Sequence, residues 1–120
     1  MNTSAETGKY GESVVCEYLQ DNGFDILHTN WRNGRYELDI VAQKDGYLHI
    51  VEVKTRKKDS LTSPESAMTR TKFRFLCKAA EFYIALYHID TEVQFDLASV
   101  IYTAEGYEID YIPDVMSSVW

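Results

Sequence analysis

Residues 36–55 have the sequence YELDIVAQKDGYLHIVEVKT, and this stretch decides the fold. Residues 36–43 and 47–55 are both rich in β-branched and aromatic side chains, and Asp45-Gly46 between them is a strong hairpin-turn signal. With these two residues as the loop, Lys44 pairs with Tyr47. We therefore expect two antiparallel strands in a fixed register.

This register puts Asp39 opposite Glu52, and Glu37 opposite Lys54. Because side chains alternate across a strand, these four should share one face of the hairpin. The other face is apolar and is expected against the core; it carries Leu38, Ile40, Ala42, Val51 and Val53.

Two directly opposed carboxylates destabilise a sheet unless something neutralises them. A divalent cation would do so at Asp39 and Glu52, since Mg²⁺ takes oxygen ligands and leaves positions for water and phosphate. Lys54 could then hold the attacking water or offset charge on the phosphorane. The pattern predicts a metal-dependent phosphodiester-cleaving site. The alternative is a solvated face on which Lys54 merely balances Glu37.

A fourth acid comes from the N-terminal segment. Residues 4–22 have the pattern of a helix that is closed by Gly23. Glu12 lies on the same stripe as the apolar residues Val15, Cys16 and Leu19. It could therefore reach the hairpin as a second metal ligand or base, or it could only stabilise the first turns through the helix dipole.

Six motifs, in their order and spacing over about residues 8–100, resemble the YraN-like family of uncharacterised bacterial proteins (uncharacterised protein family 0102). They are Gly11-Glu12, Asn30-Trp31-Arg32, residues 37–42 (ELDIVA), residues 51–56 (VEVKTR), Lys72 and Phe95-Asp96. That family is similar to the restriction-endonuclease-like fold with its PD-(D/E)XK signature, which is an acid, a gap and then acid-x-Lys. This chain departs from the family's usual pattern at Tyr36, in place of Gly, and at Gln94, in place of Arg.

The resemblance implies roles for the site residues. Asp39, twelve intervening residues and Glu52-Val53-Lys54 match the signature. Asp39, Glu52 and the Val53 carbonyl would bind Mg²⁺ or Mn²⁺, Lys54 would position the nucleophilic water, and Glu37 and Glu12 would assist. Glu12 resembles the helix-borne acid of archaeal Holliday-junction resolvases. The implied activity is cleavage of structured nucleic acid, and the superfamily's habit of pairing makes a homodimer a further expectation.

The net charge of −7 and the pI near 4.8 oppose nucleic-acid binding, because binders normally carry a basic footprint. The charge is segregated, however. Residues 54–78 carry eight Lys or Arg against two acids, a balance of +6 that leaves −13 for the rest. Besides Lys54, the expected phosphate contacts are Arg56, Lys57, Lys58, Arg70, Lys72, Arg74 and Lys78. The alternative is a solvated helix face that only aids solubility.

The remaining segments complete an αβββαββ order. We expect strands at residues 24–30, 93–102 and 107–112, a polar flap-like loop at 57–63 and a helix at 64–87. Asp96 is expected to be a surface or structural acid and not a ligand. The chain of 120 residues is expected to be one restriction-endonuclease-like α/β domain, a mixed sheet of about five strands flanked by helices, with an acidic, loosely held tail from about residue 113.

Cys16 and Cys77 are expected to be buried unpaired thiols in a reducing cytoplasm. No secretory signal or membrane-spanning apolar run is evident. Two functions besides a nuclease stay open. One is a non-catalytic nucleic-acid-binding module in DNA processing, and the other is a protein–protein adaptor that uses the acidic C-terminal surface. Nucleic acid is the expected partner, with DNA as the first expectation.

Overall fold

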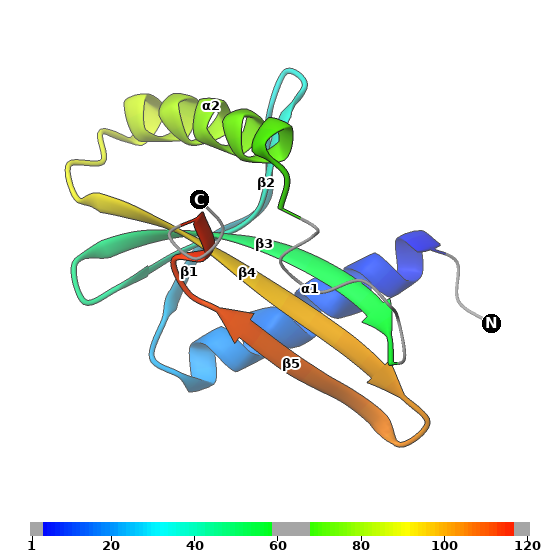
Figure 1. The fold of residues 1–120 in the computed structure, drawn as a ribbon. Coiled ribbons are helices and arrows are strands. Elements are labelled where there is room, and N and C mark those ends of the chain that lie inside the picture. The colour runs from blue at the N-terminus through cyan, green and yellow to red at the C-terminus, as the bar shows by residue number, and fades with distance from the viewer. Residues whose placement is uncertain (1–3, 59–67, 117–120) are drawn as a thin grey trace.

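The computed structural model describes residues 4–58 and 68–116, with only the backbone described for residues 4–7. Figure 1 shows the order of the elements along the chain. The order is the expected αβββαββ: α1 (Ser4–Asp21), β1 (Asp25–Asn33), β2 (Tyr36–Lys44), β3 (Tyr47–Lys57), α2 (Arg70–Tyr87), β4 (Glu92–Thr103) and β5 (Gly106–Ile112).

The strands form one mixed sheet in the order β1-β2-β3-β4-β5. Every neighbouring pair is antiparallel except β3 and β4, which are parallel and are joined through α2. Parallel neighbours need such a crossover, because the chain must return to the starting edge of the sheet. The architecture confirms the predicted α/β fold and is compatible with the restriction-endonuclease-like fold.

The two helices cover opposite faces of the sheet (Figure 1). Residues of α1 pack with Ile40, Ala42 and Val51 on one face, while residues of α2 pack with Val41, Leu48 and Ile50 on the other. The hairpin is therefore apolar on both faces. The expectation of a single apolar face was wrong, because it treated the hairpin as a surface element and not as the centre of three layers.

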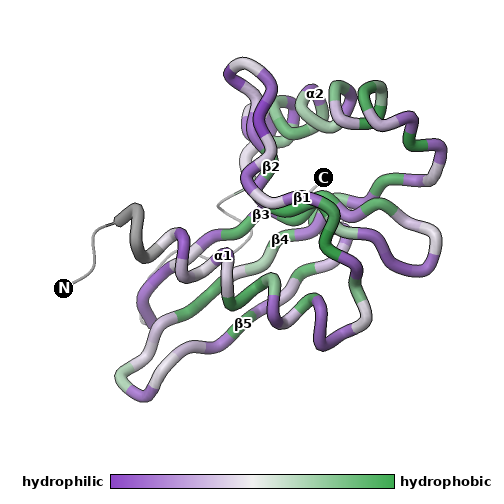
Figure 2. The backbone as a smooth tube through the Cα atoms, turned by 180° about the vertical axis from the view of Figure 1, so that it is seen from behind, coloured by the Kyte–Doolittle hydropathy of each residue, from purple (hydrophilic) through white to green (hydrophobic). Residues whose placement is uncertain are grey.

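The hydropathy of the chain follows these layers (Figure 2). Apolar residues concentrate along β2, β3 and β4, which lie between the helices, whereas the turns at the ends of the sheet are polar. Among the described residues no helix is long and apolar enough to cross a membrane.

The helix ends have local causes. Gly23, with φ of 87°, follows α1, a conformation that glycine adopts at little cost. Helix α2 begins later than expected, because the Thr69 side chain accepts a hydrogen bond from the Lys72 backbone N–H and caps the helix. Met68 is therefore outside the helix, and the expected helical residues 64–67 lie outside the described part of the chain, as does most of the expected flap.

The strands match their predicted positions within three residues. The largest difference is in β1, which continues through Asn33 where a turn was expected from Trp31. Trp31 is buried against Tyr83 of α2, so packing holds this segment in the sheet. Cys16 and Cys77 are unpaired thiols, as expected, and both are half-buried.

Asp96 of β4 is a structural acid with 1% exposure. It accepts hydrogen bonds from His49 (2.7 Å), Gln94 (2.9 Å), the Asp114 backbone N–H (2.8 Å) and the Tyr111 hydroxyl. Burial raises the pKa of Asp96, but these donors outweigh it and hold the pKa below its usual value.

The segment after β5 is attached to the sheet. The Asp114 backbone is bonded to Asp96, and the side chain of Val115 is fully buried in the core on the α2 side. The expectation of a loosely held tail from residue 113 is therefore wrong for residues 113–116. Residues 117–120 lie outside the described part.

Candidate functional site

The candidate site lies where β2 separates from β3. The predicted register is confirmed from the turn as far as Ile40 and Val51, where the described ladder between the two strands ends. Beyond it, the Val53 backbone N–H donates to Oδ2 of Asp39 at 2.9 Å, so a side chain takes the place of a strand partner. Asp39 and Glu52 were expected to be a cross-strand pair, and this expectation is wrong. They meet because Asp39 turns into the gap between the strands.

A distortion on β1 accompanies this change. Thr29 pairs with Ile40 and Trp31 pairs with Leu38, so Asn30 lies across from Asp39. Asn30 has a φ of 51°, a left-handed conformation that asparagine tolerates better than most residues.

Leu38 and Ile40 consequently belong to opposite cores. Leu38 packs on the α2 side and Ile40 on the α1 side, which corrects the expectation that they share a face. The sequence analysis did not predict the left-handed backbone of Asn30. The available signal was an asparagine within a run of residues that otherwise favours a strand.

The two carboxyl groups of Asp39 and Glu52 form the centre of the site, and we refer to them as the carboxylate pair. Burial raises the pKa of both groups, and the charge of Asp39 helps to raise that of Glu52 to about 8. A hydrogen bond joins the two side chains and favours the proton on Glu52, so that its O–H donates to Asp39. Near neutral pH Glu52 therefore keeps its proton, which it shares with Asp39 through this hydrogen bond.

Lys72 reaches this pair from α2. Its Nζ lies 3.1 Å from Oε1 of Glu52, and the Glu52 side chain is only 14% exposed. The sequence had placed Lys72 among the phosphate contacts, so its contact with an acid of the site is a finding of the structure. Lys72 lies in the first turn of α2, directly after the Thr69 cap, and its long side chain extends from there to Glu52 of β3.

Lys54 and Glu37 do not pair with each other. Glu37 is bonded instead to Arg32, its neighbour in the ladder with β1, at 3.5 Å between Nη2 and Oε1. Lys54 is exposed on β3, and alternation along the strand puts its side chain on the same face as that of Glu52. Among the described residues no acid lies within ion-pair distance of the Lys54 ammonium.

Helix α1 brings Glu12 toward the hairpin because of the glycine before it. A Cβ atom on Gly11 would lie 2.2 Å from Cγ2 of Thr55, so only glycine allows this approach of α1 to β3. Glu12 is half-buried. Burial raises the pKa of Glu12, as do the charges of Asp39 and Glu37, while a hydrogen bond from the Asn30 side chain opposes the rise.

The donor atoms fit a hard cation. The described residues contain no group of three or more His, Cys, Asp and Glu that could hold a metal ion, so any ligand set here combines the carboxylate pair with backbone and water oxygens. The Val53 carbonyl is available for this, because the N–H and C=O of one strand residue point to the same edge. Oxygen donors without nitrogen or sulfur suit Mg²⁺ or Mn²⁺. Asp39, Glu52 and Val53 are thus the residues that would hold one.

The predicted phosphate-contacting residues fall into two groups. Arg56, Lys57 and Lys58 lie at the end of β3, where the Arg56 Nε donates to Oγ of Ser99 at 3.4 Å. The exposed residues Arg70, Arg74 and Lys78 lie along α2, and Lys78 is bonded to Glu81 at 3.5 Å. The contact between Lys72 and Glu52 shows that the start of α2 lies beside β3, so the site has basic side chains on two neighbouring elements.

Known proteins share this chain's sequence over most of its length. It is 44% identical over 109 residues to a UPF0102 protein of Parabacteroides distasonis, covering 91% of this chain and 90% of that protein. A UPF0102 protein of Bacteroides thetaiotaomicron is 43% identical with the same coverage, and one of Flavobacterium psychrophilum is 38% identical over 91% of this chain and 92% of that protein. The model of Uncharacterised protein family UPF0102 matches residues 11–100. The chain therefore belongs to Uncharacterised protein family UPF0102.

Proposed function

We propose that this chain is a metal-dependent nuclease that hydrolyses phosphodiester bonds in structured nucleic acid, in the manner of a Holliday-junction resolvase. The carboxylate pair carries the proposal. Two largely buried acids that share a proton destabilise the fold when both ionise. Acids whose pKa values are raised by burial and by a neighbouring charge are typical of functional sites. They also stand beside Lys54, whose ammonium has no acid partner among the described residues.

The residues divide the chemistry among them. Asp39, Glu52 and the Val53 carbonyl hold the cation, which when bound supplies Lewis-acid stabilisation of the scissile phosphate. The Lys54 ammonium orients the attacking water and offsets the negative charge that develops on the phosphate oxygens. The water oxygen forms the new bond to phosphorus, and the bond to the leaving oxygen breaks.

Glu12 is suited to accept the proton of the water. Its pKa is raised from the ordinary value by burial, which makes its carboxylate a better base near neutral pH. The negative charge of Glu37 contributes to the raised pKa of both Glu12 and Asp39. Arg56, Lys57, Lys58 and the exposed cations of α2 would contact phosphates on either side of the cut.

Cleavage of labelled branched, single-stranded and duplex oligonucleotides in Mn²⁺, Mg²⁺ or chelator tests the proposal. We expect metal-dependent cleavage by the wild type, lost in Asp39→Ala and in Lys54→Ala, with unfolding midpoints near that of the wild type. Glu108→Ala is the matched control, because Glu108 is an exposed acid of β5 that has no role in the proposed site. Equal residual cleavage by the wild type and both site variants would identify a contaminant and refute the proposal.

One observation favours a second function, a non-catalytic nucleic-acid-binding module in DNA processing. Lys72 already supplies a positive charge 3.1 Å from Glu52, so a binding module could keep the carboxylate pair without a metal ion. Calorimetric titration with Mg²⁺ and Mn²⁺ separates the two. A nuclease must bind the metal and lose this binding in Glu52→Ala, whereas oligonucleotide binding without any metal binding favours the module.

A further inference from the structure

Three tyrosines from three different elements meet at the end of the sheet where β4 turns into β5. The rings of Tyr10 of α1 and Tyr102 of β4 are stacked, with centroids 5.9 Å apart and an interplanar angle of 27°. Tyr107 of β5 meets the Tyr10 ring edge-on at 6.0 Å. Tyr10 is nonetheless 47% exposed and Tyr107 is 41% exposed. A cluster of large exposed rings is a common feature of binding surfaces, whereas single exposed rings are ordinary.

A groove of about 610 Å³ lies against this cluster. It is lined by Lys57, Lys58, Tyr102, Thr103, Ala104 and Glu105. The register fixes its walls, since Lys57 pairs with Tyr102 and the Lys58 backbone N–H donates to the Tyr102 carbonyl at 2.8 Å. Both lysine side chains are exposed, and within the described residues neither ammonium is in an ion pair. The groove thus presents two cations against one acid in a chain of net charge −7.

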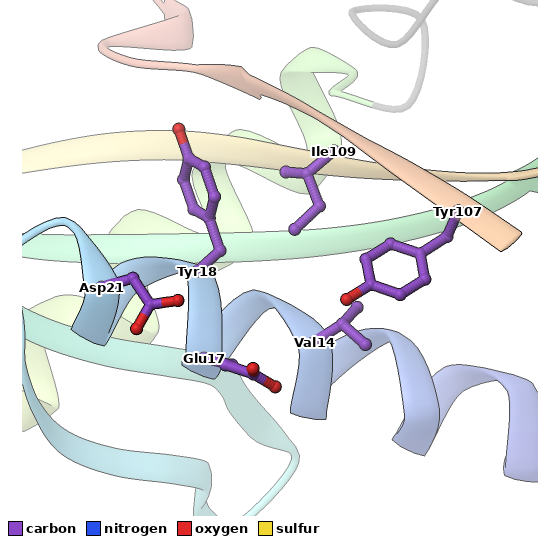
Figure 3. A pocket seen from close by; sticks show the side chains of 6 residues that line it. All are labelled: Val14, Glu17, Tyr18, Asp21, Tyr107 and Ile109. Atoms are coloured by element: carbon purple, nitrogen blue, oxygen red, sulfur yellow. The ribbon is translucent and has the colours of Figure 1, made fainter.

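A second hollow, which Tyr107 lines, has the reverse charge. This hollow has a volume of about 280 Å³. Figure 3 shows that its lining side chains come from α1 and β5. Its lining includes Glu17 and Asp21 together with Tyr18 and Tyr107. These carboxylates repel phosphate. A polyanion that reaches the tyrosines is therefore steered to the side of Lys57 and Lys58.

We propose that the groove and the tyrosine cluster bind single-stranded nucleic acid. Bases would stack on the exposed rings of Tyr10 and Tyr107, while Lys57 and Lys58 contact the phosphates. Aromatic platforms beside basic grooves bind single strands in this way, because every base has a face that can stack. Duplex bases are already stacked on one another, so the tyrosines select unpaired strands.

The groove lies on the other face of the sheet from Lys54. Lys57 follows Lys54 by three residues on β3, which is about 10 Å, and alternation puts their side chains on opposite faces. Tyr102, which pairs with Lys57, packs on the α1 side, whereas Glu52 contacts Lys72 of α2. The groove and the tyrosine cluster are therefore a binding surface separate from the carboxylate pair, and the inference goes beyond the proposed function.

Fluorescence anisotropy of labelled single-stranded and duplex oligonucleotides, measured in chelator so that no cleavage occurs, tests this directly. We expect Tyr10→Ala and Tyr107→Ala each to weaken single-strand binding by about 5-fold to 150-fold, since stacking contributes about 1–3 kcal/mol per base. Duplex binding should change less than twofold. Tyr47→Ala is the matched control, because Tyr47 has the same 41% exposure as Tyr107 but lies at the β2–β3 turn.

Two further variants keep the test decisive if the alanine variants unfold. Tyr10→Phe retains the ring and should keep wild-type affinity. The double variant Lys57→Gln/Lys58→Gln should reduce the magnitude of the salt slope of single-strand binding by about 1.4, the value for two lost phosphate contacts.

Equal affinity for single strands and duplex, or an equal loss in Tyr47→Ala, would overturn the inference. Binding that survives in Asp39→Ala without any cleavage by the wild type would refute the nuclease and leave this inference standing. Cleavage by the wild type, together with unchanged single-strand binding in the tyrosine variants, would refute this inference and leave the nuclease standing.

Discussion

Replacement of Glu52 by glutamine should make the metal-free protein more stable at alkaline pH. Glutamine has the shape of a protonated glutamate, so it keeps the contact with Asp39 without the charge. The pKa of Glu52 is raised to about 8 in the fold, against 4.5 for an unperturbed glutamate. A raised acid contributes stability below its unfolded pKa, and that stability is lost as the pH rises through the folded value.

The magnitude follows from these two values. A raised pKa lowers the free energy of unfolding by about 1.36 kcal/mol for each pH unit between the unfolded and the folded value. For Glu52, between pH 4.5 and pH 8, the loss is up to about 5 kcal/mol. This is a large part of the roughly 5–15 kcal/mol that holds a typical domain together. Glu52→Gln should therefore match the wild type near pH 5 and exceed it by several kcal/mol near pH 8.5.

Urea unfolding in chelator at a series of pH values measures this difference. Glu108→Gln is the control, because Glu108 is an exposed acid of β5 and its replacement should leave the pH dependence unchanged. If the wild type and Glu52→Gln have parallel stability curves from pH 5 to pH 8.5, the carboxylate pair does not share a proton and the reasoning fails.

Three other variants test the supports of the site. Lys72→Met should cost about 1–2 kcal/mol above pH 8, where Glu52 ionises, but little near pH 6 and little in a Glu52→Gln background; an equal cost at both pH values would contradict the ion pair. Gly11→Ala should destabilise by about 1–3 kcal/mol, and Thr55→Ser, which removes the obstructing Cγ2, should restore most of the loss measured by urea unfolding. Asp96→Asn should cost about 2–4 kcal/mol at pH 7, and because the pKa of Asp96 is lowered, the difference from wild type should shrink as the pH falls below about 4; a constant difference would show that its charge is not involved.

Much of the fold could be predicted because its signals are local. The Asp45-Gly46 turn fixed the register of β2 and β3, and the two periodicities of strand and helix gave the element order. The start of α2 could not be placed in this way. Residues 68 and 69 have no pattern that excludes a helix, and only the bond between Thr69 and the Lys72 backbone shows where the helix begins.

The proximity of Asp39 and Glu52 was predicted, but for a reason that does not hold. Strict alternation would make them cross-strand neighbours, whereas the ladder ends before them and Asp39 binds the Val53 backbone. The left-handed backbone of Asn30 lies across from Asp39 on β1, a third strand. A prediction made from the hairpin of β2 and β3 alone does not include that strand.

The contact between Lys72 and Glu52 was beyond sequence reasoning for a different reason. Nineteen residues lie between them in the sequence, and their approach depends on how α2 crosses the sheet. In the sequence, every lysine of the basic segment is an equally good candidate for a phosphate contact. Only the structure distinguishes Lys72 from Lys78, which is bonded to Glu81 on its own helix.

Calorimetric titration of Mn²⁺ at pH 7.5 into the wild type, Asp39→Asn, Glu52→Gln and Lys54→Met tests the central claim most directly. The account predicts one site in the wild type, loss of binding in both acid variants and retention in Lys54→Met, because this lysine acts on the water and not on the cation. Binding that persists in Asp39→Asn and Glu52→Gln, or no binding by the wild type, would contradict a metal site at the carboxylate pair.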